Sequence, residues 1–241
     1  MAQTSNRVGF VHFKTKENFD NKVANNEILD TSIVFVQDSK EIHAHGITYK
    51  SINWSVLSYS NGVYIYDING KYTLPSEWDT SRNEEAVGVA ILTDDCSFVV
   101  AKEDIGQKTW GGYGTDTASL TNYSQTEAAK DFAGVTNTRL IIEALGVGNA
   151  PAAEACASYS FLNGQTGYLG AAGEWKLARS YKDELNSALE LIGGTKMAES
   201  YYWASTEVDS SSAWGLYFAS SSTMNPGVKY GNRYVRAFLA I

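Results

Sequence analysis

YYWASTEVDSSSAWGLYFASSSTMNPGVKYGNRYVRAFLAI, residues 201–241, combines two kinds of position that follow different rules. Between large or chemically distinctive residues stand Val, Asp, Ser, Gly, Tyr, Ala, Thr, Asn, Pro and Arg. Randomising the two adenines of an asparagine codon that ends in a pyrimidine reaches every residue type of this second set, but never Trp, Met, Lys, Glu or Gln. The first set includes four of those unreachable types and consists of Trp203, Glu207, Trp214, Leu216, Phe218, Met224 and Lys229.

Residues 214–219 alternate between apolar and small or polar residues, which is the period of a strand with one buried face. Trp214, Leu216 and Phe218 are expected to share the buried face. The other face would carry Gly215, Tyr217 and Ala219 and point to solvent. Residues on such a surface can be substituted without disturbing the packing of the core. An ordinary Ser-rich surface hairpin remains an alternative interpretation, because Ser-rich loops are common.

The composition favours a folded protein with a substantial core. The 241 residues are 44% hydrophobic and 12% aromatic, enough for one large or two modest domains. The formal net charge is −8, and Lys and Arg form no cluster or stripe. We therefore expect no nucleic-acid partner.

The cysteines and the N-terminal region restrict the class of protein further. Cys96 and Cys156 have no CxxC spacing and no third cysteine, which favours two buried thiols over a disulfide framework or a zinc site. Residues 1–20 lack a basic start followed by an apolar run, and they contain no cysteine for lipid attachment. No stretch approaches the ~20 apolar residues of a membrane span. We expect no signal peptide, no transmembrane segment and no membrane insertion. If the protein works outside the cell, it would leave by cell lysis, as part of a particle, or by another route.

The first part of the chain, residues 1–78, is predicted to be a small β-rich domain that attaches or links the protein to a carrier particle or a partner subunit. A short amphipathic helix is expected over residues 14–24. β-branched and aromatic runs bounded by turn residues predict strands at 32–38, 42–49, 51–60 and 62–68, the first two as a hairpin.

The second predicted domain, residues 79–241, has α+β character. A buried-type strand at 87–92 is followed by a partner strand at 97–104. A glycine-rich loop with two aromatic residues follows at 110–117. Helices are expected from 126–132 into 138–146 and again over 182–194, with glycines at their C-terminal ends. The remainder is predicted to be strand and loop.

Several residue groups resemble reactive or metal-binding sites but lack the partners that such sites need. His43 and His45 would share one face of a strand, yet a two-ligand metal site has no third or fourth ligand here. The doublets Asp94–Asp95 and Glu84–Glu85 would point to opposite faces, so paired acid/base work is disfavoured. The glycine-rich loop has no phosphate-binding lysine context, and no GxSxG motif occurs. We expect no catalytic residues, no metal site and no cofactor.

Five separate blocks in the second domain carry a resemblance: EWDTSRNEEAVGVAIL, WGGYGTDTASLTNYS, NGQTGYLGAAGEWKL, ALELIGG and YYWASTE…AWGLYF…YVRAFLA. Over about residues 78–241 the chain resembles the C-type-lectin-fold variable proteins targeted by diversity-generating retroelements. The similar branch is the one related to the formylglycine-generating enzyme and sulfatase-modifying factors. The resemblance implies an α+β, C-type lectin-like domain preceded by the small β-rich domain.

The N-terminal segment SIVFVQDSKEIHAHGITY carries a second resemblance. It is similar to an element of tail and fibre proteins from phages of gut Bacteroides-like bacteria, a strand, an acidic turn and an aromatic-x-His-Gly-x-x-Tyr sequence. His43 stands where that element usually has an aromatic residue.

The family resemblance implies a binding protein whose gene is rewritten at its 3′ end by mutagenic reverse transcription. The variable, ligand-binding region is about residues 201–233, with Trp203, Trp214, Phe218 and residues 234–241 as scaffold. Tyr217 and Tyr230 among small residues resemble an antibody paratope in composition. The candidate variable residues are Val208, Asp209, Ser211, Ser212, Gly215, Tyr217, Ala219, Ser220, Ser222, Thr223, Asn225, Pro226, Gly227, Val228, Tyr230, Gly231, Asn232 and Arg233.

Two departures from related proteins limit the chemistry. Catalytic members of the wider fold use paired cysteines near the chain end, whereas Cys96 and Cys156 lie far from it. The EPN, QPD and WND triplets of calcium-dependent sugar-binding lectins are absent. The sequence interpretation is therefore a receptor-binding protein on a phage or prophage virion tail, or at an extracellular surface. Its partner would be a bacterial surface receptor, protein or glycan, with contacts to other tail proteins or to itself.

Three alternatives to this interpretation stay open. One is a variable protein displayed on the surface of the bacterium itself. Another is an enzyme of the sulfatase-modifying-factor type. The last is a structural tail adaptor, in which residues 201–233 would be an ordinary loop.

Overall fold

The computed structural model describes residues 10–13, 17, 20–21, 24, 33–36, 41–44, 47–50, 59–94, 96–117, 121–219 and 224–241. The chain divides into two compact units, Met1–Tyr59 and Ser60–Ile241. The sequence predicted this division near residue 78, but strand β5 (Gly62–Asp67) pairs with β7 (Ala86–Leu92) of the second unit. Because the backbone groups of β5 are satisfied in that sheet, the boundary lies before Ser60.

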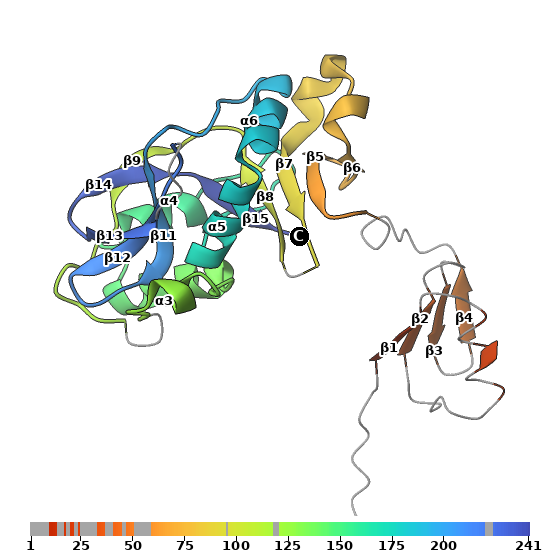
Figure 1. Cartoon of the computed structure of the whole chain (residues 1–241), viewed down its shortest axis with the longest axis horizontal. Coiled ribbons are helices and arrows are strands. Elements are labelled where there is room, and N and C mark those ends of the chain that lie inside the picture. Colours follow the sequence, from red (N-terminus) through yellow and green to blue (C-terminus); the bar gives the residue numbers. More distant parts are fainter. Residues whose placement is uncertain are drawn as a thin grey trace, which may run out of the picture. The chain divides into compact units, whose positions relative to one another are not determined.

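The first unit contains a four-stranded sheet in the order β1-β2-β3-β4 (Figure 1). Its strands are β1 (Phe10–Phe13), β2 (Ile33–Val36), β3 (Glu41–Ala44) and β4 (Ile47–Lys50). β1 runs parallel to β2, and the other pairs are antiparallel. The predicted hairpin is present as β2 and β3, but its return segment continues as two strands, because Ala44 pairs with Ile47. The described residues within the predicted helix 14–24 are helical, and most of the predicted strand 51–60 lies outside the described residues.

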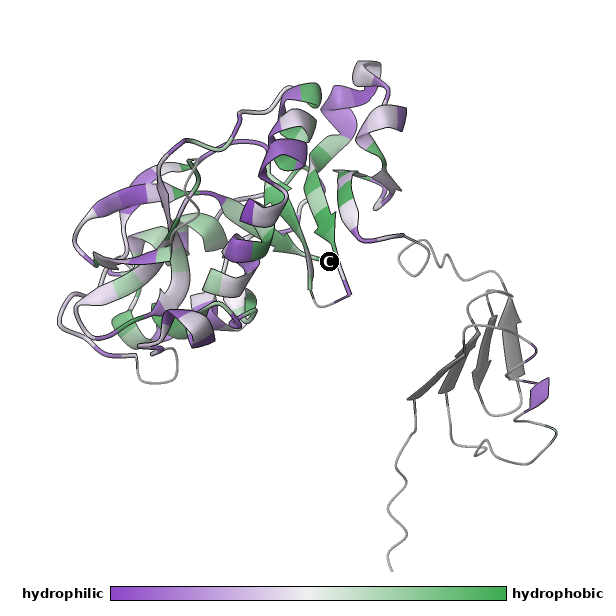
Figure 2. Cartoon of the chain, viewed as in Figure 1, coloured by the Kyte–Doolittle hydropathy of each residue, from purple (hydrophilic) through white to green (hydrophobic). Residues whose placement is uncertain are grey.

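The second unit is built on two sheets, the larger of which has six strands in the order β10-β15-β8-β7-β5-β6. These are β10 (Tyr168–Leu169), β15 (Ala237–Ala240), β8 (Ser97–Ala101), β7, β5 and β6 (Tyr72–Thr73). Every residue of β7 is buried, as its run of Ala, Val, Ile and Leu predicted, and Figure 2 shows hydrophobic residues along this strand. A strand of this type needs cover on both faces.

The smaller sheet has five strands in the order β13-β12-β11-β14-β9. They are β13 (Met224–Val228), β12 (Ser212–Tyr217), β11 (Tyr201–Glu207), β14 (Asn232–Val235) and β9 (Gly106–Thr109). The C-terminal stretch therefore supplies four of the five strands. β11 and β14 are parallel, and the remaining pairs are antiparallel.

Helices of the second unit pack against both sheets, with Trp175 at the centre of the core. The helices are α2 (Gln125–Ala128), α3 (Gly134–Leu145), α4 (Pro151–Ala157), α5 (Ala172–Ser180) and α6 (Lys182–Leu191), besides 3-10 turns at Pro75–Glu77 and Thr80–Glu85. The Trp175 ring from α5 lies 5.0 Å from that of Tyr202 on β11 and 4.6 Å from that of Phe238 on β15. One side chain thus joins the two sheets.

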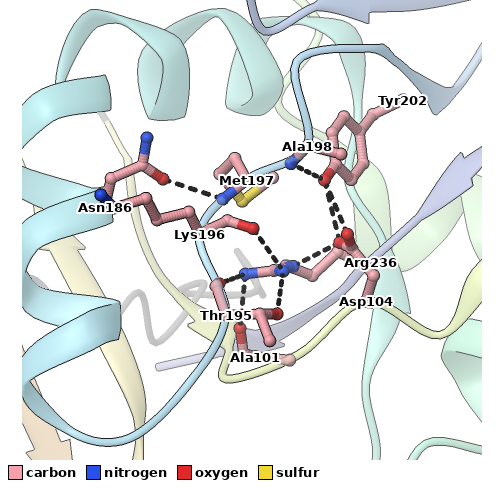
Figure 3. A network of polar contacts seen from close by, with 9 residues as sticks. All are labelled: Ala101, Asp104, Asn186, Thr195, Lys196, Met197, Ala198, Tyr202 and Arg236. Atoms are coloured by element: carbon pink, nitrogen blue, oxygen red, sulfur yellow. Dashed lines mark hydrogen bonds and ion pairs between the residues drawn. The ribbon is translucent and has the colours of Figure 1, made fainter.

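A buried polar network holds the chain where it passes from one sheet to the other (Figure 3). Arg236 lies between β14 and β15 and is fully buried. Its guanidinium donates to the Asp104 carboxylate at 2.6 Å and to the Thr195 carbonyl at 2.9 Å. The Tyr202 hydroxyl donates to the same carboxylate at 2.9 Å. A buried charge that is paired and hydrogen-bonded in this way fixes the junction, because losing either partner would leave the other unpaired.

The predicted helix at 182–194 is present as α6, and the one from 126 to 146 is present as α2 and α3, with α3 beginning earlier than predicted. Helices α4 and α5 were missed, because their segments were assigned to strand and loop. A signal for α4 was available, since Pro151 occupies a first helical position before an Ala-rich run. Among the described residues, no helix is both long and apolar enough to cross a bilayer.

Candidate functional site

The chemically distinctive positions of the C-terminal stretch are all buried. Trp203, Trp214, Leu216 and Phe218 are buried, which confirms the sequence prediction for all four. Glu207, Met224 and Lys229 are buried as well, and the whole set is at most 6% exposed. Every residue of this stretch whose type adenine randomisation of an Asn codon cannot reach is therefore buried.

Most described candidate variable positions lie at least partly at the surface. Asn225, Pro226, Val228, Tyr230 and Asn232 are exposed. Asp209, Ser211, Ser212, Tyr217, Gly227, Gly231 and Arg233 are half-exposed. Ser220, Ser222 and Thr223 lie outside the described residues.

Three candidate positions, Val208, Gly215 and Ala219, are buried, which corrects the expectation that they face solvent. Gly215 does lie on the face opposite Trp214, but the side chain of Arg233 covers it: a Cβ on Gly215 would lie 2.0 Å from Arg233 Nη1. Val208 belongs to the hydrophobic core, and Ala219 is held by a 2.6 Å hydrogen bond from Arg179 to its carbonyl. The predicted alternation of faces along the strand was correct, but side chains from neighbouring segments cover part of its outer face.

The register of the five-stranded sheet brings aromatic and polar residues together on its outer side. Tyr201 pairs with Tyr217, and Trp203 pairs with Gly215, which in turn pairs with Asn225. Because alternate residues of a strand share a face, these positions lie on one surface together with others of the same parity. We call this surface the sheet face, and it consists of Tyr201, Trp203, Gly215, Tyr217, Asn225, Gly227 and Arg233.

Side-chain contacts hold the aromatic part of the sheet face in place. The rings of Tyr201 and Tyr217 are 4.7 Å apart between centroids. The Asn225 amide donates to the Tyr201 hydroxyl at 2.8 Å. Tyr201 and Tyr217 are half-exposed, so they present ring surface to solvent without being free to move independently. Aromatic side chains fixed in this way provide contact area at low cost in conformational entropy.

Arg233 crosses the sheet face from β14 to β13. Its guanidinium carbon lies 4.4 Å from the centre of the Trp203 ring and 4.6 Å from that of Tyr201. Nη1 donates to the Asn225 carbonyl at 3.1 Å, and Nη2 donates to the Pro226 carbonyl at 3.0 Å. Burial lowers the pKa of Arg233 from its usual value, but arginine remains charged at neutral pH. The sheet face therefore carries one positive charge in an otherwise aromatic and amide surface.

The glycine-rich loop 110–117 packs against the end of the five-stranded sheet through the buried ion pair of Lys229 and Glu207. Lys229 Nζ contacts Glu207 Oε1 and donates to the Thr115 carbonyl at 2.7 Å. The Thr117 amide donates to Glu207 Oε2 at 2.8 Å. Lys229 also lies over the ring of Trp110, 4.6 Å from its centre. The fixed Glu and Lys of the C-terminal stretch thus anchor a loop from a distant part of the sequence.

Tyr113 of the anchored loop forms an exposed aromatic pair with Tyr230 of the turn after β13, and we call this pair the loop patch. Tyr113 is 58% and Tyr230 is 66% exposed, and their ring centroids are 5.1 Å apart. Gly111, two residues before Tyr113, has a φ of 97°, and a Cβ there would lie 2.1 Å from the Asn149 carbonyl oxygen. Only glycine suits that position, so the loop has little freedom.

The structure adds Tyr113 and Tyr201 to the surface that sequence reasoning had restricted to the candidate variable set. Tyr201 could have been found, since it precedes Trp203 by the two-residue period of the strand. Tyr113 carries no such signal, because only the folded loop brings it next to Tyr230.

The two cysteines of the alternative enzymatic interpretation differ in burial. Cys156 is buried, and burial raises its pKa, which disfavours the reactive thiolate. Cys96, the other cysteine, is half-exposed, and so less enclosed than expected. Among the residues that the structure describes, no group of three or more His, Cys, Asp or Glu side chains is placed to hold a metal ion.

Of the carboxylate and histidine doublets, Glu84–Glu85 is the one that the structure describes in full. Glu85 forms an ion pair with Arg82 at 2.6 Å, while Glu84 is exposed. Asp94 is exposed, and Asp95 and His45 lie outside the described residues.

Comparison with known proteins identifies one similar solved structure. No protein-family model and no curated protein matches this chain. A crystal structure of a fimbrial protein from Bacteroides ovatus is similar at a TM-score of 0.58 and 14% sequence identity. The match covers 87% of this chain and 52% of the fimbrial protein, so the chain spans about half the length of that protein. At this identity the similarity shows a shared fold and nothing about the ligand.

Proposed function

We propose that this protein binds a ligand on a bacterial surface through a diversified face carried on a rigid scaffold. The observation that carries the proposal is the division of the C-terminal stretch into buried and surface positions. The residues that adenine randomisation cannot produce are all buried, whereas twelve of the fifteen described candidate positions are exposed or half-exposed. A stretch of ordinary surface drift would have no reason to divide along the lines of the genetic code.

The resemblance to retroelement-targeted variable proteins supplies the mechanism of diversity. On this proposal the second unit has a C-type lectin-like fold, and reverse transcription rewrites positions between 208 and 233. The mixed α+β architecture with two sheets is compatible with such a fold. The protein binds rather than catalyses, and the N-terminal unit attaches it to a carrier.

Two carriers are proposed. A phage or prophage tail is favoured by the N-terminal segment 32–49, which resembles tail and fibre elements. Display by the bacterium itself is supported by a different observation, the similarity to a fimbrial protein of Bacteroides ovatus. Both place the sheet face outside the cell.

The proposal is tested by replacing the exposed aromatic anchors of the candidate region. Interface energy concentrates in a few Tyr, Trp and Arg side chains, so Tyr217→Ser with Tyr230→Ser is expected to abolish binding to intact Bacteroides cells that the parent protein recognises. Tyr123→Ser is the matched control, because Tyr123 is 72% exposed but lies outside the candidate region. Circular dichroism checks that each variant is folded.

Unchanged cell binding by the folded double variant would contradict the proposal for this face. Loss of binding in Tyr123→Ser as well would show that any exposed tyrosine matters, which a localised site does not predict. Substitutions in the N-terminal sheet, such as Tyr49→Ser in β4, are expected to leave cell binding intact and to impair attachment to the carrier.

A further inference from the structure

The side chain of Arg233 lies over two glycines of the sheet face, in space that a side chain at either glycine would fill. A Cβ on Gly227 would lie 2.3 Å from the guanidinium carbon, and one on Gly215 would lie 2.0 Å from Nη1. The side chain starts on β14 and ends against β13, in contact with residues of β11 and β12 on the way. A planar, charged group is thus enclosed from several strands.

The groups in contact with the Arg233 guanidinium have the chemistry of a guanidinium-binding site. The rings of Trp203 and Tyr201 offer two cation–π faces, at 4.4 and 4.6 Å from the guanidinium carbon. The Asn225 carbonyl accepts a hydrogen bond from Nη1, and the Pro226 carbonyl accepts one from Nη2. We call these two rings, two glycines and two carbonyls the guanidinium cradle.

Most of the cradle does not depend on which side chains the candidate variable positions carry. The two acceptors are main-chain carbonyls, so residues 225 and 226 supply them whatever their identity. Trp203 is a residue type that adenine randomisation cannot produce, and Tyr201 lies outside the candidate set. Gly215, Gly227 and Arg233 are the replaceable members, so the occupant and the space for it belong to the variable part.

We propose that the guanidinium cradle is a binding site for an arginine side chain of a protein ligand, and that Arg233 fills it in this chain. Where position 233 holds a small residue, the cradle is open and the ligand's arginine takes the place of Arg233. That second clause rests on the proposed function, because it assumes that position 233 varies. The net charge of −8 favours approach of a basic partner.

The cradle selects a guanidinium over an ammonium group. Two parallel N–H donors reach two carbonyls while the same plane stacks on aromatic rings, which a compact ammonium cannot reproduce. Lys108 is an internal cation next to Arg233 in the sheet, since it pairs with Arg233 across β9 and β14. Its side chain can be removed without losing the hydrogen bond from Trp203 Nε1, because that bond goes to the Lys108 carbonyl at 2.9 Å.

The experiment empties the cradle and offers it a fragment of the proposed occupant. Arg233→Ala combined with Lys108→Ala is titrated with n-propylguanidinium and with the neutral n-propylurea, and the indole N–H resonance of Trp203 is followed by NMR. The expected result is a saturable shift of this resonance with n-propylguanidinium. The affinity should be at least about tenfold higher than that for n-propylurea, and at least about tenfold higher than that of the parent protein for n-propylguanidinium. Adding Gly227→Val gives the matched control, which fills the cradle and should abolish the shift.

Equal weak binding of both compounds, or equal binding to the parent protein and the emptied variant, would overturn the proposal. If the double variant does not fold by circular dichroism, Arg233→Thr with Lys108 intact is titrated in the same way. A negative fragment titration would not contradict the role of Tyr217 and Tyr230 in cell binding. Disproof of the proposed function would not change the expected result of the fragment titration. The two claims are therefore tested separately.

Discussion

Lys229→Met tests whether the fixed residues of the C-terminal stretch are required by the fold. The substitution keeps a long side chain but removes the charge that contacts Glu207, the hydrogen bond to Thr115 and the cation–π contact with Trp110. Glu207 Oε2 then keeps the Thr117 amide at 2.8 Å and lies 3.0 Å from the Thr121 hydroxyl, whereas Oε1 loses its contact with Lys229 in a fully buried position. Breaking a buried pair costs about 3–5 kcal/mol, and this is the loss expected for Lys229→Met.

The assay is urea denaturation of the parent protein, both single variants and the double variant, so that a coupling energy is obtained. Glu207→Gln alone leaves Lys229 buried without its counter-charge and should also destabilise. The double variant should be more stable than the sum of the single losses predicts, with a coupling of about 2 kcal/mol. Asn232→Ala is the surface control and should change stability by no more than about 0.5 kcal/mol. Equal losses for Lys229→Met and Asn232→Ala would refute the reasoning.

Three further predictions follow from burial. Burial raises the pKa of Glu174 to about 8. The stability that this residue contributes is therefore fully present below its unfolded pKa, near 4.5, and is lost as the pH rises through about 8. Denaturant midpoints between pH 5 and 9 should fall more steeply for the parent protein than for Glu174→Gln, and parallel curves would contradict this. Trp214→Ala should cost about 3–5 kcal/mol in unfolding free energy, whereas Ser211→Ala should cost no more than about 0.5 kcal/mol, and similar denaturation midpoints would count against a rigid scaffold with a replaceable surface. Cys156 should react with a thiol reagent only on unfolding, because it is buried and burial raises its pKa; rapid labelling at Cys156 in the native protein would show that the thiol is accessible.

The strands of the core could be predicted from the sequence because their patterns are local. The continuous apolar run at 87–92 and the alternation at 214–218 state directly which faces are buried, and the structure buries them. Helices α4 and α5 were missed because Ala-rich and Gly-containing segments of this length carry weak periodicity. Their helical state depends on tertiary contacts, such as the Trp175 ring between the two sheets.

The candidate site was predictable as a region but not as a surface. Exposure of Tyr230 and Asn232 follows from their place in the sequence, but burial of Gly215 follows from Arg233, which reaches it only after β14 and β12 join one sheet. The partnership of Lys229 with Glu207 and of Tyr113 with Tyr230 likewise depends on contacts between distant segments. No local pattern encodes such contacts.

Sequencing the 3′ end of the gene and its flanking DNA in a growing population tests the central claim most directly. The account predicts a near-identical downstream copy with adenines at the candidate codons, beside a reverse transcriptase gene. It also predicts substitutions concentrated at codons 208–233 that spare Trp214, Met224 and Lys229. Absence of any such copy, with substitutions spread evenly over buried and exposed codons, would contradict it.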